Sequence, residues 1–181
     1  ILVRNDLRKI TFLLTCLLLA SCGSRIGRFQ DSLEIRSQQD PSLSGDGQKL
    51  ALIVEYKGRP SVQLRDLSNG EVIRLRHLSK NQPHSSPSLS WNGRYLAVIA
   101  QRGNRRLAII EDRLTGQSHQ FPTPGERIPV RLSLSPDASR LAIQIAEKGK
   151  WRIELFDLRE RIEPDQPRGS SFSSNSEDST L

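Results

Sequence analysis

Few residues of this chain have the type and spacing that chemistry requires. The three histidines, His77, His84 and His119, are not spaced as metal ligands and have no cysteine beside them. The segment GQSHQ (116–120) begins like the Gly-x-Ser-x-Gly motif of hydrolases but lacks its final glycine. We therefore predict no catalytic residue, no metal site and no cofactor, and we expect that the chain is not an enzyme.

Cys22 is the residue best placed for covalent modification. Basic residues near the start of the chain precede an apolar stretch over 10–20, followed by small residues and the thiol. The stretch is too short to cross a bilayer as a helix, which takes ~20 residues, but it suits a signal peptide. A buried core helix that carries two cysteines is the alternative.

The tetrapeptide Leu19-Ala20-Ser21-Cys22 resembles the lipobox of bacterial lipoproteins. The resemblance implies a diacylglyceryl thioether on Cys22, cleavage after Ser21 and anchoring to a membrane through the lipidated cysteine. It also implies an exported protein that is lipid-anchored to a bacterial membrane and faces the periplasm or the cell exterior. Residues 1–21 are then a lipoprotein signal peptide, and residues 22–40 are anchor and linker.

A decamer occurs three times in the chain, as SLSGDGQKLA (42–51), SLSWNGRYLA (88–97) and SLSPDASRLA (133–142). The copies start 46 and 45 residues apart. A period of ~40–50 residues with β-strand character is typical of β-propeller blades. The decamer therefore predicts one inner hairpin per blade.

Each copy predicts the same local structure. Asp46, Asn92 and Asp137 fall in the turn after the SLS tripeptide, where such side chains can accept from backbone amides two residues on. A β-branched strand, a glycine-containing turn and a second strand follow. That second strand ends each time at an aspartate, and these residues are Asp66, Asp112 and Asp157. One aspartate per blade, always in the same register, favours a structural role over acid–base chemistry.

Ser135-Pro136-Asp137, followed three residues later by Leu141-Ala142, resembles the PD40 repeat, a WD40-like β-propeller repeat of TolB-like proteins. The resemblance implies an all-β fold, namely a partial β-propeller of three four-stranded antiparallel blades over 41–162. The expected blades lie at about 41–86, 87–131 and 132–162.

The outer strands of the blades are expected to differ. The first two blades have candidate outer strands at 71–78 and 118–122. The third is expected to be short or incomplete, because Arg161 stands where Gly116 makes the preceding turn in the second blade. Residues 163–181 are rich in serine, proline and acidic side chains, which predicts a disordered tail.

Three blades are fewer than the four to eight of a closed propeller, so an apolar face and a strand edge would stay open. Self-association, docking on another envelope protein and truncation of a longer propeller are all compatible with this pattern. We expect a non-enzymatic envelope lipoprotein whose TolB-like propeller acts as a protein-interaction module. The alternatives are a periplasmic binder of glycan or another anionic envelope polymer and, less favoured, a remnant of a propeller-containing peptidase.

The net charge of +7 does not indicate nucleic-acid binding. The basic residues are scattered, and no basic stripe alternates with aromatic residues, so we predict no nucleic-acid partner. Arg59, Arg102, Arg105 and Arg106 fall in loops between second and third strands. They are candidates for contacts with anionic groups, with surface solubility as the alternative.

Overall fold

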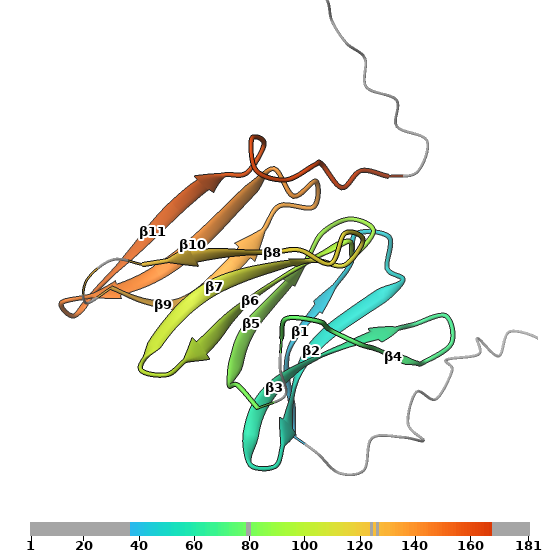
Figure 1. Cartoon of the computed structure of the whole chain (residues 1–181), viewed down its shortest axis with the longest axis horizontal. Coiled ribbons are helices and arrows are strands. Elements are labelled where there is room, and N and C mark those ends of the chain that lie inside the picture. The colour runs from blue at the N-terminus through green and yellow to red at the C-terminus, as the bar shows by residue number, and fades with distance from the viewer. Residues whose placement is uncertain (1–36, 79–80, 124, 126, 168–181) are drawn as a thin grey trace, which may run out of the picture. The chain divides into compact units, whose positions relative to one another are not determined.

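The computed structural model describes residues 37–167 except 79–80, 124 and 126, all of which belong to the compact unit Ile35–Leu181. The described residues form antiparallel sheets with no helix (Figure 1). The strands are β1 (Gln38–Leu43), β2 (Lys49–Tyr56), β3 (Arg59–Asp66), β4 (Val72–Ile73), β5 (His84–Leu89), β6 (Tyr95–Arg102), β7 (Arg105–Asp112), β8 (Ser118–Pro122), β9 (Ile128–Leu134), β10 (Arg140–Glu147) and β11 (Lys150–Asp157).

Each sheet is one propeller blade, with its strands hydrogen-bonded in chain order. The first blade is β1-β2-β3-β4, the second is β5-β6-β7-β8 and the third has only β9-β10-β11. The predicted fold class, a partial β-propeller with an incomplete third blade, is confirmed. The three blades lie side by side, and their long hairpins point in one direction (Figure 1).

Two-residue turns make these long hairpins narrow at the tip. In the first blade Tyr56 pairs with Arg59, and the intervening Lys57 and Gly58 both have positive φ, at 49° and 73°. Lys148 and Gly149 repeat this conformation in the third blade, with φ of 48° and 74°. A turn with two left-handed residues matches the right-handed twist of the strands.

The hydrophobic core is divided into two clusters, one at each junction between blades. Residues such as Ile53 and Leu64 of the first blade pack against Leu96 and Ile109 of the second, and all four are at most 1% exposed. The opposite face of the second blade, with residues such as Ile110, packs against the third blade. A blade therefore buries its two faces only with neighbours on both sides.

The outer strand of the first blade is shorter than predicted. The sequence suggests a strand over 71–78, whereas β4 covers only Val72–Ile73. Beyond it, the amides of Arg76 and His77 donate to the carboxylate of Glu111 in the second blade, at 2.9 and 2.7 Å. The chain has then left its own sheet to dock on the next one.

The blade boundaries also lie earlier than predicted. The inner strands begin at Gln38, His84 and Ile128, so the first blade includes residues that the sequence assigns to the linker over 22–40. At the other end, Glu163, Asp165 and Gln166 make hydrogen bonds although the sequence assigns them to a disordered tail. The rest of that predicted tail, 168–181, lies outside the described residues. Over the part of the chain that the structure covers, no helix is long and apolar enough to span a membrane.

Candidate functional site

The inner turns of the first and third blades share two hydrogen bonds to an aspartate. In the first, Asp46 Oδ1 accepts from the Ser44 hydroxyl at 2.5 Å and from the Gln48 amide at 2.9 Å. In the third, Asp137 Oδ1 accepts from the Ser135 hydroxyl at 2.6 Å and from the Ser139 amide at 3.0 Å. These hydrogen bonds hold the pKa of both aspartates below the usual range, although burial acts to raise it.

In the second blade, the equivalent carboxylate comes from a residue outside the turn. Its own turn residue is Asn92, and the hydroxyl of Ser90 donates to Asp165 Oδ2 at 2.5 Å. The Asn92 amide donates to the same oxygen at 2.8 Å, and the Asn92 side chain donates to Asp165 Oδ1 at 2.9 Å. The Asp165 backbone amide also donates to the carbonyl of Asp137, at 2.9 Å. Asp165, only 5% exposed, therefore joins the inner turns of the second and third blades.

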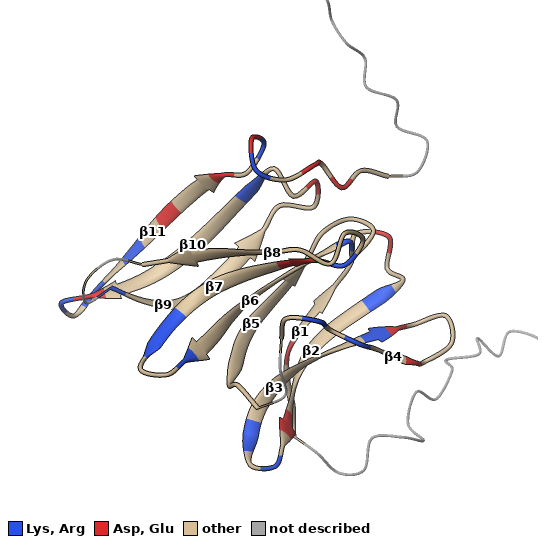
Figure 2. Cartoon of the chain, in the orientation of Figure 1, with Lys and Arg blue, Asp and Glu red and all other residues tan. Residues whose placement is uncertain are grey.

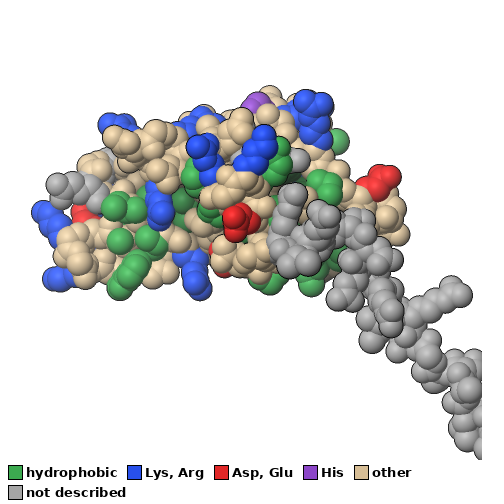
Figure 3. All heavy atoms as spheres, turned by 90° about the horizontal axis from the view of Figure 1, so that it is seen from below, with side chains coloured by type: hydrophobic (Ala, Val, Ile, Leu, Met, Phe, Trp, Pro, Cys, Tyr) green, Lys and Arg blue, Asp and Glu red, His purple; other side chains and the backbone are tan. Residues whose placement is uncertain are grey.

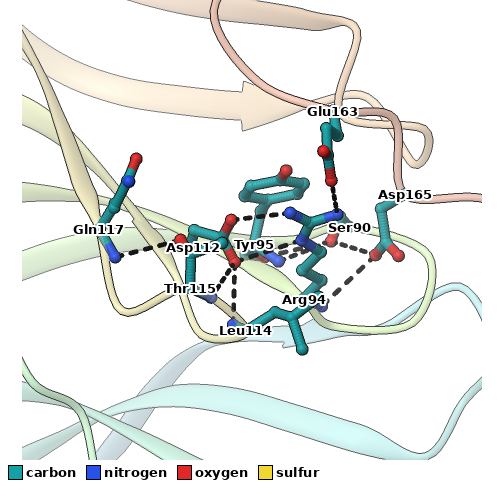
Figure 4. A network of polar contacts seen from close by, with 9 residues as sticks. All are labelled: Ser90, Arg94, Tyr95, Asp112, Leu114, Thr115, Gln117, Glu163 and Asp165. Carbon is teal, nitrogen blue, oxygen red and sulfur yellow. Dashed lines mark hydrogen bonds and ion pairs between the residues drawn. The ribbon is translucent and has the colours of Figure 1, made fainter.

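An arginine extends this network across the second blade. Arg94 donates to Asp112 at 2.9 and 3.2 Å and to Glu163 at 2.8 Å (Figure 4). Burial acts to raise the pKa of Asp112, but the Arg94 hydrogen bonds and the amides of Leu114 and Thr115 lower it further than burial raises it. Asp112 is thus an ionised carboxylate fixed in place.

The recurrent aspartates at the ends of the third strands hold the next turn in every blade. Asp66, Asp112 and Asp157 each accept from the amide two residues on, at 2.9, 2.8 and 3.1 Å. Each also accepts from a hydroxyl or an arginine, namely Ser68 for Asp66, Arg94 for Asp112 and Arg159 for Asp157. This arrangement stabilises the turns.

The histidines are dispersed. His84 is buried, its Nδ1 accepts from the Val62 amide at 3.3 Å, and burial together with Arg102 lowers its pKa to about 4. His77 contacts the Gly116 carbonyl at 2.6 Å, and His119 lies on β8. Ser118 starts β8 after a hairpin turn, which is not the strand-to-helix turn of a hydrolase nucleophile. Within the described residues, no three His, Cys, Asp or Glu side chains are grouped as metal ligands would be.

The strongest candidate for a binding surface is the outward face of the third blade. Trp151, Ile153 and Leu155 of β11 are 66, 64 and 70% exposed. Leu155 and Ser133 flank Ala142 of β10 on this face, and Ser133 is exposed as well. We call Ser133, Ile153 and Leu155 the open face, and Trp151 lies at its edge beside the hairpin turn.

The corresponding positions in the other blades are covered. In the second blade, Ala108 and Ile110 occupy the register of Ile153 and Leu155, and both are fully buried against the third blade. In the first blade, Val62 and Leu64 are buried against the second. The open face is therefore a blade-to-blade contact surface without a following blade among the described residues.

A hydroxyl marks the same surface in every blade. Ser42 Oγ accepts from the Leu89 amide of the second blade at 3.1 Å, and Ser88 Oγ accepts from the Leu134 amide of the third at 2.9 Å. These are the first serines of the repeated SLS tripeptide. Ser133 is the third of them, and it lies on the open face.

The lipobox, Leu19, Ala20, Ser21 and Cys22, lies outside the described residues. Lipidation at Cys22 therefore stays a prediction from the sequence.

Comparison with known proteins supports the fold. No family model matches the chain. A TolB homolog from Chlorobium luteolum is 24% identical over 118 residues, which are 65% of this chain and 26% of that protein. The chain thus matches about a quarter of this curated relative.

Two solved structures extend the comparison. TolB from Acinetobacter baumannii superposes with a TM-score of 0.53 at 20% identity, covering 69% of this chain and 31% of that one. The β-propeller domain of the Trilobed protease from Pyrococcus furiosus gives 0.52 at 18% identity, covering 75% and 45%. The fold is a partial β-propeller. More specifically, it is a TolB-like β-propeller, as the repeat in the sequence indicates.

Sequence reasoning missed Asp165, Arg94 and Glu163 of the polar network, and also Glu111, which binds the first blade. Asp165 and Glu163 fall in a segment with the composition of a tail, and Arg94 and Glu111 have partners outside their own blade. Asn92 was the available signal, because it is the one turn residue of the three that is not an aspartate.

Proposed function

We propose that the chain is an exported lipoprotein of the cell envelope and that its TolB-like propeller acts as a protein-interaction module through the open face. One observation supports this most directly. The open face repeats, in the same register, a surface that receives a blade at both junctions inside the chain. Exposed apolar patches of this kind mark interaction sites.

The occupant that fits this face is a propeller blade of a second copy of the chain. The equivalent faces accept an antiparallel sheet whose inner strand donates an amide to the serine hydroxyl. Ser133 presents that hydroxyl again, next to Leu155 across β10. A blade supplied by another molecule would bury Ile153 and Leu155 as Ala108 and Ile110 are buried.

Sedimentation velocity of the full chain over a range of concentrations tests this proposal. We expect a reversible dimer, and we expect Ile153→Asp to weaken it at least about tenfold, since a charge would enter an apolar contact. Leu114→Asp is the matched control, because Leu114 is 73% exposed and lies away from the open face, in the turn before β8. A chain that stays monomeric, or a dimer that both variants weaken equally, would contradict the proposal.

Membrane anchoring is tested separately. Mass spectrometry of the protein extracted from bacterial membranes should show a chain that begins at a lipid-modified Cys22. Cys22→Ser should release the chain from the membrane fraction or leave its signal peptide uncleaved. An unmodified Cys22 in a chain that retains residues 1–21 would refute the lipoprotein assignment.

A further inference from the structure

The three long hairpin tips form one strongly basic rim. These are the turns between β2 and β3, between β6 and β7 and between β10 and β11. Neighbouring inner turns are linked at the other end of the blades, because the Asp46 amide donates to the Trp91 carbonyl and the Trp91 amide to the Pro136 carbonyl. The hairpin tips therefore share the opposite side (Figure 1). We call the cationic residues of these tips the basic rim: Lys57, Arg59, Arg102, Arg105, Arg106, Lys148, Lys150 and Arg152.

The two ends of the blades differ in how their charges are distributed. Apart from the half-buried Arg102, every residue of the basic rim is exposed. The recurrent aspartates, together with Glu163 and Asp165, lie at the other end, with the inner turns. Figure 2 shows mostly blue segments at the hairpin tips, whereas blue and red segments are mixed at the other end. The clustering of cations in the basic rim creates a positive electrostatic potential, which their scattered positions in the sequence do not reveal.

Few described carboxylates offset the basic rim. Glu147 is engaged by Arg127 at 3.3 Å and by Arg152 at 3.5 Å, and Glu55 is exposed on β2. Seen from below Figure 1, the molecule has basic side chains spread over its surface, with few acidic ones (Figure 3). The basic rim therefore favours an anionic partner with an extended surface over a single small anion.

An exposed tryptophan lies within the basic rim. Trp151, 66% exposed, stands between Lys150 and Arg152, next to the turn of the third hairpin. An exposed indole ring at a cationic hairpin tip is suited to the headgroup level of a bilayer, where tryptophan is enriched. This combination points to a lipid surface.

The chain enters the propeller at the same rim. β1 runs antiparallel to β2, and Gln38 pairs with Val54, close to the first hairpin tip. The segment that precedes Gln38 therefore joins the first blade on the side of the basic rim. Cys22 is 16 residues earlier in the sequence, so the connection can span at most about 55 Å.

We propose that the basic rim lies flat against an anionic phospholipid surface, with Trp151 inserted at the level of the headgroups. The support from chain entry rests on the proposed lipid anchor. The support from the charge of the basic rim and from Trp151 does not depend on that anchor. Each lysine or arginine near an anionic leaflet adds to the attraction, and salt weakens it. This orientation points the inner turns away from the membrane.

The two tryptophans of the chain provide an internal test, because Trp91 lies in an inner turn at the other end of the blades. The chain from residue 22 with Cys22→Ser retains every described strand and carries no lipid. Trp91→Phe leaves Trp151 as the sole tryptophan, and Trp151→Phe leaves Trp91. The vesicles contain phosphatidylcholine alone or with phosphatidylglycerol, whose acyl chains are brominated to quench nearby indoles.

We expect anionic vesicles at low salt to shift the Trp151 emission to the blue and to quench it, with little change at Trp91. Arg59→Glu, Arg105→Glu and Lys150→Glu together should weaken vesicle binding at least tenfold. The matched control reverses three exposed charges at the other end, Arg140→Glu, Arg159→Glu and Arg161→Glu, and should change binding less than twofold. Circular dichroism verifies that both variants are folded.

Quenching of Trp91 instead of Trp151, equal binding to neutral vesicles, or equal losses in both triple variants would overturn the proposal. So would a blue shift of Trp151 with soluble polyphosphate but no quenching by brominated vesicles, which would assign the rim to anionic polymers. The lipid anchor is absent from this assay. If Cys22 proves not to be lipidated, the vesicle-binding result still stands. If the vesicles are not bound, the lipidation result still stands.

Discussion

A single carboxylate shows how a repeat tolerates a substitution inside one of its copies. The second blade has Asn92 where the others have aspartate, and Asp165 occupies the place of the missing carboxylate. The Ser90 hydroxyl donates to Asp165 as Ser44 donates to Asp46. The hydrogen-bond pattern of the turn is thus maintained although the acceptor is 73 residues away in the sequence.

The exchange of these two residues is directly testable. Asp165→Asn should lower the free energy of unfolding by about 1–3 kcal/mol, because buried amide and hydroxyl donors lose their charged acceptor. Asn92→Asp in that background should restore much of the loss by returning a local carboxylate. Asn92→Asp alone should destabilise the protein, because it places two carboxylates at hydrogen-bond distance. Urea denaturation measures all three.

Glu163→Gln is the control for this exchange. Its ion pair with Arg94 has a carboxylate that is 78% exposed, so its loss should have a much smaller effect than the loss of Asp165. If Asn92→Asp failed to compensate for Asp165→Asn, the two positions would not be equivalent.

At the scale of the element, the strands and hairpins were predictable because their determinants are local. The SLS tripeptide, the glycine turns and the alternating strand residues all lie within one repeat. The shortening of β4 was not predictable, since it depends on Glu111 of the next blade. The same holds for Asp165. Its neighbours in sequence have the composition of a tail, and its partners lie in inner turns.

The serine of each inner strand allows a comparison within one molecule. Ser88→Ala should cost about 0.5–1.5 kcal/mol, because the Leu134 amide loses its acceptor at the junction between blades. Ser133→Ala removes the equivalent hydroxyl from the open face and should leave the stability of a monomer nearly unchanged. Thermal unfolding at low protein concentration compares them, and equal losses would contradict the assigned roles.

At the scale of the whole described unit, stability should be highest in the middle. The second blade is covered on both faces, and its strands β6 and β7 each contain six consecutive buried residues. The third blade has β11 at its edge, where most side chains are exposed. Backbone amides exchange their hydrogens more slowly in strands that are buried between neighbouring blades.

Hydrogen exchange followed by mass spectrometry should therefore show the slowest exchange in β6 and β7. Exchange in β11 should be fastest in dilute solution and should slow as concentration rises and the open face becomes covered. Uniform exchange across the blades, or β11 protection that is independent of concentration, would disagree with this gradient.

The position of Asp165 has a consequence for the order in which the protein matures. A polypeptide leaves the ribosome or a translocation channel with its first residues ahead, so the early repeats emerge before the later ones. The inner turn of the second blade nevertheless lacks the carboxylate of Asp165 until that residue has emerged, after the whole third blade. The second blade is thus completed only when nearly the last of the described residues has emerged, and a chain interrupted before that point would lack a stabilising contact of its central blade.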